Sequence, residues 1–160
     1  MPAGSRRFST AVSAILAGGL IAGVLDITYA CVFSYIRRGA TPAAVFRSVA
    51  AGALGPSARA GGAKTAILGL FFHFLIALIA ASVYYFASRV LPFMITHPFI
   101  CGLLYGLCVY LVMYGIVLRV VKITTAYPWS YPWPLLTGNV LIHMLGIGLP
   151  IALVVRKFSK

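Results

Sequence analysis

The chain has 160 residues, of which 62% are hydrophobic and 9% are charged, and its mean hydropathy is +1.03. This composition excludes an ordinary water-soluble enzyme of this size. Thirteen Lys and Arg residues against one acidic residue give a net charge of +12. Because the basic residues stand at the ends of apolar runs, we expect the lipid bilayer and its anionic phospholipid head groups as partners, and no nucleic acid.

The chain has too few carboxylates for two common kinds of site. A single acidic side chain excludes catalysis by paired carboxylates and a metal cage built from carboxylate oxygens. Cys31, Cys101 and Cys108 are odd in number and lie inside apolar runs, which argues against a disulfide framework and against a zinc site. We therefore expect a protein that is not an enzyme and that has no metal or other cofactor.

Four apolar segments are long enough to cross a bilayer, whose hydrocarbon core of about 30 Å needs about 20 helical residues. They cover residues 10–36, 66–88, 98–118 and 135–155. The predicted fold is all-α: one domain over residues 1–160, built as a four-span transmembrane helical bundle. The first segment resembles a secretory signal, but Asp26 interrupts it and the apolar run continues to Ile36, so we expect a retained span.

A short amphipathic helix is predicted over residues 42–54, between the first and second spans. Thr41 can cap it and Pro42 can open it, and Gly55 and Pro56 end it. Its apolar face consists of Val45, Phe46, Val49, Ala50, Ala53 and Leu54. Arg47 and Ser48 lie off that face, so we expect the helix to rest in the plane of the membrane interface.

Tyrosine, tryptophan and proline alternate in residues 127–134, just before the fourth span. Indole and phenol rings favour the head-group zone of a bilayer, so an interfacial aromatic belt stiffened by prolines is one interpretation. The other interpretation is a lid over the mouth of the bundle. His97 begins the third span and is expected at the opposite interface.

The distribution of basic residues does not fix the direction of insertion. With the N-terminus inside, the inner side holds Arg6, Arg7, Arg89, Arg156, Lys157 and Lys160. The outer side then holds Arg37, Arg38, Arg47, Arg59, Lys64, Arg119 and Lys122. Six residues against seven give no preference under the positive-inside rule.

The two halves of the chain share short similar segments. Gly19 and Gly23 in the first span correspond to Gly102 and Gly106 in the third, and His73 in the second corresponds to His143 in the fourth. This predicts two helical hairpins of the same orientation. Glycines four residues apart allow close helix packing, so we expect these pairs at helix contacts, including those of a homodimer.

Asp26 is the only side-chain carboxylate of the chain, and it lies about ten residues inside the first span, on the same face as Gly19 and Gly23. His73 on the second span, and Asn139 and His143 on the fourth, also share faces with small residues. Counted along the helices, Asp26 and both histidines lie at a similar depth of roughly 12 to 15 Å. An ionised Asp alone in hydrocarbon costs at least about 2.5 kcal/mol, so we expect a cluster in which Asp26 meets His73 and His143, with Asn139 as a hydrogen-bonding neighbour.

Three functions are compatible with this cluster. A carboxylate and two imidazoles that change protonation state would serve a small proton- or cation-linked transporter or channel. The same groups could form a structural clamp worth roughly 0.6 kcal/mol per bond, in a non-catalytic scaffold or assembly subunit. The two histidines could also be axial ligands of a haem b in an electron-transfer protein.

The part of the chain from His73 to Lys157 resembles small uncharacterised bacterial inner-membrane proteins of the YagU type. The resemblance rests on a histidine-led span that ends at Leu91-Pro92-Phe93, on Gly102-Leu103-Leu104-Tyr105-Gly106, on Pro128-Trp129, and on a histidine-bearing last span that ends at Arg156-Lys157. It implies a multi-pass protein of the bacterial inner (plasma) membrane with cytoplasmic termini. It implies no particular reaction.

Overall fold

The computed structural model describes residues 3–122, 124 and 126–159, with side chains from residue 10 onward, and these residues form helices and connecting turns without strands. Four helical segments are long and apolar enough to span a membrane: Thr10–Arg38, Ala63–Val90, Pro98–Val120 and Trp133–Phe158. Each contains the segment predicted from the sequence. The predicted all-helical fold with four spans is confirmed.

The first two spans are single helices, whereas the last two are interrupted. The first span belongs to α1 (Ala3–Arg38), and the second is α3 (Ala63–Val90). The third consists of α5 (Pro98–Val112), the π-helical segment η2 (Met113–Val117) and α6 (Leu118–Val120). The fourth consists of α7 (Trp133–Leu141), the π-helical segment η4 (Ile142–Gly148) and α8 (Leu149–Phe158). The apolar pattern of the sequence did not predict either π segment.

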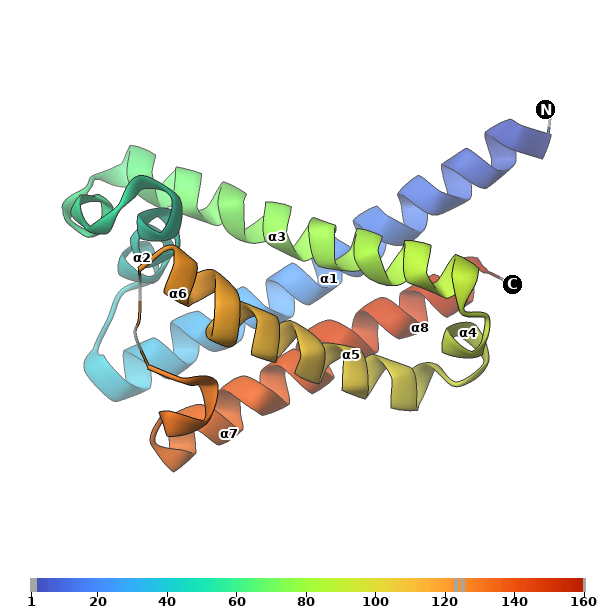
Figure 1. Ribbon diagram of the computed structural model, residues 1–160. Helices are drawn as coiled ribbons and strands as arrows, with labels where there is room; N and C mark the ends of the chain where they lie inside the picture. The colour runs from blue at the N-terminus through green and yellow to red at the C-terminus, as the bar shows by residue number, and fades with distance from the viewer. Residues whose placement is uncertain (1–2, 123, 125, 160) are drawn as a thin grey trace.

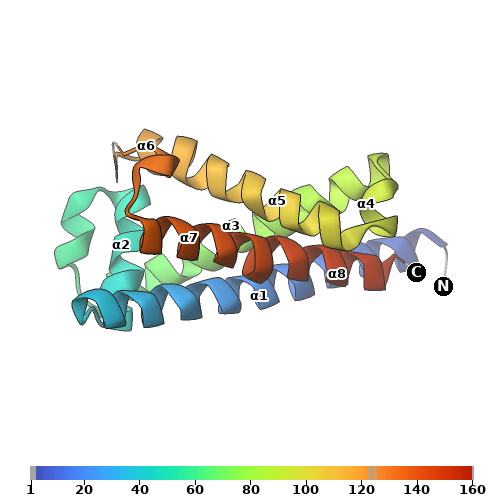
Figure 2. The same cartoon turned by 90° about the horizontal axis from the view of Figure 1, so that it is seen from below.

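Helix α2 (Pro42–Leu54) has the predicted bounds. The Thr41 Oγ1 atom accepts a hydrogen bond from the Ala44 amide at 3.3 Å, and Gly55, with φ of 87°, ends the helix. Helix α2 crosses one end of the bundle, as Figure 2 shows, and packs on α3, where Gly69 lies against the Phe46 backbone. Three further short helices connect the spans: η1 (Pro56–Ala60), α4 (Phe93–Thr96) and η3 (Pro128–Ser130).

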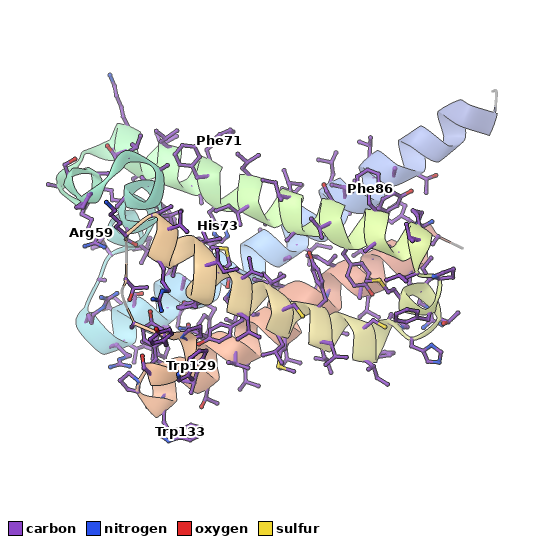
Figure 3. All side chains as sticks on the ribbon, in the orientation of Figure 1. Arg59, Phe71, His73, Phe86, Trp129 and Trp133 are labelled. Atoms are coloured by element: carbon purple, nitrogen blue, oxygen red, sulfur yellow. The ribbon has the colours of Figure 1, made fainter. Side chains whose placement is uncertain are left out.

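The spans pack in the order α3, α1, then η4 with α8, then α5, and both ends of the described chain lie away from α2 (Figure 1). In the most apolar 18-residue stretch of the fourth span, 44% is buried, against 17 to 22% in the corresponding stretches of the other three spans. The fourth span is therefore the most buried of the four, and the others present long apolar faces outward. On α3, for example, Phe71 and Phe86 point away from the bundle (Figure 3).

The predicted glycine pairs lie at helix contacts inside the chain. Gly19 and Gly23 of α1 lie against Leu78 and Phe74 of α3, and Gly102 and Gly106 of α5 lie against the backbone of η4 and α8. Each pair thus faces the second span of its own hairpin. These faces are therefore occupied within the chain.

One half of the bundle is packed and the other half is hollow. The buried core includes Ala14, Tyr84, Met94 and Ile151, which lie toward the α4 end. There Tyr105 of α5 donates a hydrogen bond of 2.6 Å to the Ala80 carbonyl of α3, and its ring meets the ring of Tyr84. Toward the α2 end, residues of all four spans and of α2 line a cavity instead.

Candidate intramembrane binding site

All four predicted polar residues line one cavity of about 700 Å³ at the α2 end of the bundle: Asp26 from α1, His73 from α3, Asn139 from α7 and His143 from η4. Helix α2 contributes Val45, Ser48 and Val49 to the wall, and the third span contributes Met113, Tyr114 and Val117. Most of the other lining side chains are apolar. A cavity of this size holds a small organic molecule, whereas one water molecule occupies only about 30 Å³.

His73 connects the second span to the first. Its side chain lies on the inner side of α3 (Figure 3), and its Nε2 atom donates a hydrogen bond of 2.9 Å to the Gly23 carbonyl of α1. Gly23 makes this approach possible, because an added Cβ atom would lie 2.7 Å from the Phe74 ring. The absence of a side chain at Gly23 therefore leaves room on α1 for both His73 and Phe74.

His143 is 7% exposed and lies in the π-helical segment of the fourth span. Its Nδ1 atom donates a hydrogen bond of 2.8 Å to the Asn139 carbonyl, one turn earlier in the same span. The rings of Tyr110 and Tyr114 meet the imidazole edge to face, with centroids 5.5 and 5.9 Å away. His143 is thus held by its own backbone and by two aromatic rings of the third span.

Asp26 is half-buried on the cavity wall, and among the described residues it forms no hydrogen bond and no ion pair. No ion pair joins Asp26 to His73 or His143 in the described structure, and the hydrogen bonds of both histidines go to backbone carbonyls. A carboxylate at this depth then needs water, a proton or a cationic ligand.

Two further polar atoms on the cavity wall have no partner within the described structure. They are the Tyr29 hydroxyl and the Nδ2 atom of Asn139, whose side chain is 6% exposed. Leaving a buried polar group without a hydrogen bond costs about 1 to 3 kcal/mol. The Tyr29 hydroxyl, which lies against Gly138, and the Asn139 amide thus carry this cost in the described structure.

The hydrogen bonds of the two histidines determine which ring nitrogens remain. A carbonyl oxygen can only accept, so His73 carries its proton on Nε2 and His143 carries its proton on Nδ1. In the neutral rings, Nδ1 of His73 and Nε2 of His143 are left as acceptors. Among the described residues, no group of three His, Cys, Asp or Glu side chains is arranged to hold a metal ion.

Two arginines lie at the outer end of the cavity. Arg37 and Arg38, at the end of α1, are lining residues, and the Arg37 guanidinium lies 5.7 Å from the centroid of the Phe33 ring. Both arginines are exposed. The cavity wall therefore carries cationic side chains at the bundle end and a single carboxylate deeper inside.

The aromatic loop before the fourth span lies outside the cavity. Trp129 and Trp133 lie at the bundle end (Figure 3), are 68% and 78% exposed, and do not line the cavity. Pro128 is buried and accepts a hydrogen bond of 2.6 Å from the Tyr110 hydroxyl. This geometry fits the interfacial belt better than the lid. His97, also exposed, is at the α4 end beside Thr96.

Tyr29 and Tyr114 also line the cavity, but they were not predicted from the sequence. Tyr29 follows Asp26 by three residues and so shares its helix face, which was a usable signal. Tyr114 faces the cavity from the π segment η2, and no pattern of the sequence marks where that segment begins. π turns inside α-helices occur frequently at functional sites, and here both lie on the cavity wall.

Comparison of the chain with protein-family models, with curated proteins and with solved structures finds no match. The resemblance to YagU-type proteins thus remains an expectation from the sequence. The four apolar helices and their arrangement show an all-helical protein with the character of a multi-pass integral membrane protein.

Proposed function

We propose that this protein is a small proton-linked transporter that takes an organic substrate into its intramembrane cavity. One observation carries the proposal: polar side chains from three different spans meet on the wall of one cavity of about 700 Å³, and several of their atoms lack protein partners. Intramembrane ionisable residues commonly mark substrate pathways and proton relays.

The shape of the cavity favours a transporter over an open channel. The packed half of the bundle, with Tyr84 and Tyr105 between α3 and α5, separates the cavity from the α4 end. A channel needs a continuous path, whereas a transporter holds its substrate in a site open to one side at a time. The volume also exceeds what a proton or a bare cation requires.

The titratable side chains that line the same cavity as Asp26 are Tyr29 on α1, His73 on α3, Tyr114 on η2 and His143 on η4. Arg37 and Arg38 also line it, as permanent cations. The proposed location is the bacterial inner membrane with both termini in the cytoplasm. The four spans support placing both termini on one side, and the resemblance supplies the direction.

Reconstituted vesicles containing a trapped pH-sensitive dye test this proposal. Under an imposed membrane potential, wild-type vesicles are expected to show proton movement above that of protein-free vesicles, and Asp26→Asn is expected to abolish it. Ser57→Ala, exposed on η1 and outside the cavity, is the control and should match wild type. Wild-type vesicles that behave like protein-free vesicles would contradict the proposal.

The alternative is a non-catalytic membrane scaffold, and one contact favours it. The hydrogen bond from His73 to Gly23 joins α3 to α1 without help from Asp26, as a structural clamp would. In that case Asp26→Asn changes only thermal stability or assembly. A haem-binding role is separated from both by the Soret absorption of the purified protein.

A further inference from the structure

We infer that the cavity binds an alkylammonium ion: a primary amine, protonated, with an apolar chain. This inference rests on the proposed function, because it names the substrate class of the same site. The charge of the cavity, its hydrogen-bonding groups and its apolar wall support this inference.

The charge of Asp26 on the cavity wall favours a cationic ligand. Asp26 is the only acidic side chain of the chain, it lies on the cavity wall, and no described residue pairs with it. A half-buried carboxylate without a partner is most stabilised by a positive group that also donates hydrogen bonds. An anionic ligand would instead be repelled by Asp26.

The hydrogen-bond acceptors that line the cavity favour a ligand that donates several hydrogen bonds. Because His73 and His143 give their N–H groups to backbone carbonyls, each neutral ring presents only a lone pair to any other partner. Together with Asp26, three side chains from three different helices line the cavity and can accept hydrogen bonds. A primary ammonium has three N–H donors and matches them, whereas a quaternary ammonium has none.

The apolar side chains of the cavity wall favour a ligand with a hydrocarbon chain. Leu75 and Ile76 of α3 line the cavity, and their side chains are 41% and 38% exposed. These apolar side chains offer a surface on which a hydrocarbon chain can lie. Arg37 and Arg38, at the bundle end of the cavity, repel cations, so the ammonium group is expected at Asp26, deeper inside.

Aromatic rings complete the match. Tyr29 stacks on Phe33 with centroids 5.3 Å apart, and Tyr114 packs on Tyr110 at 4.8 Å. Tyr29 and Tyr114 are both lining residues. Aromatic rings near an ammonium group add to its binding through their negative faces.

Four six-carbon probes test the inference on the protein in lipid nanodiscs, with protein-free nanodiscs as the blank: hexylamine, hexyltrimethylammonium, hexanol and hexanoate. By isothermal titration calorimetry, hexylamine is expected to bind at least tenfold more tightly than each of the other three. Binding of hexyltrimethylammonium as tight as that of hexylamine would overturn the hydrogen-bonding step. Equal or tighter binding of hexanol or hexanoate, or no binding by any probe, would overturn the inference as a whole.

The variant arm identifies the site. Asp26→Asn, which keeps the size of the side chain, is expected to weaken hexylamine binding at least tenfold, and Ser57→Ala is expected to leave it unchanged. Unchanged binding in Asp26→Asn would overturn the assignment to this cavity. If that variant does not fold, the ranking of the four probes on wild type still decides. Proton flux without hexylamine binding would reject the ammonium class and leave the transporter proposal standing.

Discussion

The Nε2 atom of His73 lies 2.9 Å from the carbonyl oxygen of Gly23, so one hydrogen bond joins α3 to α1 one turn before Asp26. His73→Leu removes this bond and is expected to lower the stability of the bundle by about 0.6 to 1 kcal/mol, the usual value of a hydrogen bond between membrane helices. Thermal unfolding in detergent measures the change. Phe71→Leu, on the outward face of the same helix, is the control, and an equal effect of both substitutions would contradict this role.

Close packing of α5 on the fourth span gives a second prediction. A Cβ atom added at Gly106 would collide with the backbone of His143 and lie 2.6 Å from the Cα atom of Met144, whereas one added at Gly18 would meet only Ile151 and Val154 at 3.6 Å or more. Gly106→Ala is therefore expected to cost about 1 to 3 kcal/mol of stability, and Gly18→Ala little. Chemical or thermal unfolding distinguishes the two, and equal tolerance of both substitutions would contradict the packing.

Two tyrosines should respond to the loss of the hydroxyl group with opposite signs. The Tyr105 hydroxyl donates a 2.6 Å hydrogen bond to Ala80, whereas the buried Tyr29 hydroxyl has no partner among the described residues. Tyr105→Phe should lower the unfolding free energy by about 1 kcal/mol, and Tyr29→Phe should raise it by about 1 kcal/mol in ligand-free protein. A loss of stability in Tyr29→Phe would mean that its hydroxyl is satisfied.

The two tryptophans of the chain report the position of the aromatic loop. Trp129 and Trp133 are exposed at the α2 end, where a bilayer would place its head groups. In reconstituted protein, lipids brominated near the head group should quench tryptophan fluorescence more than lipids brominated near the chain end. Trp129→Phe and Trp133→Phe assign the signal to each ring. Stronger quenching by the deep label would contradict an interfacial belt.

The four spans and α2 were predictable because hydropathy and capping residues act locally. Each span exceeds the length that a bilayer needs, and Thr41, Pro42 and Gly55 mark the ends of α2 through the backbone conformations they favour. The cavity residues Asp26, His73, Asn139 and His143 were also predictable, since a polar side chain in an apolar span must face the interior.

The hydrogen-bond partners and the interruptions of the last two spans were not predictable from one sequence. The choice of His73 for the Gly23 carbonyl instead of the Asp26 carboxylate depends on how α3 crosses α1. The π segments η2 and η4 change the facing of Tyr114 and His143, and they depend on packing between spans instead of local propensity. Whether a glycine pair joins helices of one chain or of two also depends on tertiary packing.

Infrared difference spectroscopy of Asp26 tests the central claim most directly. Because the chain has a single acidic side chain, its carboxyl bands can be assigned by subtracting the spectrum of Asp26→Asn, which retains the C-terminal carboxylate. Adding hexylamine to protein in lipid nanodiscs should change the Asp26 bands, and adding hexanol should not. Asp26 bands that stay unchanged at hexylamine concentrations that saturate binding would contradict an ammonium site at this carboxylate.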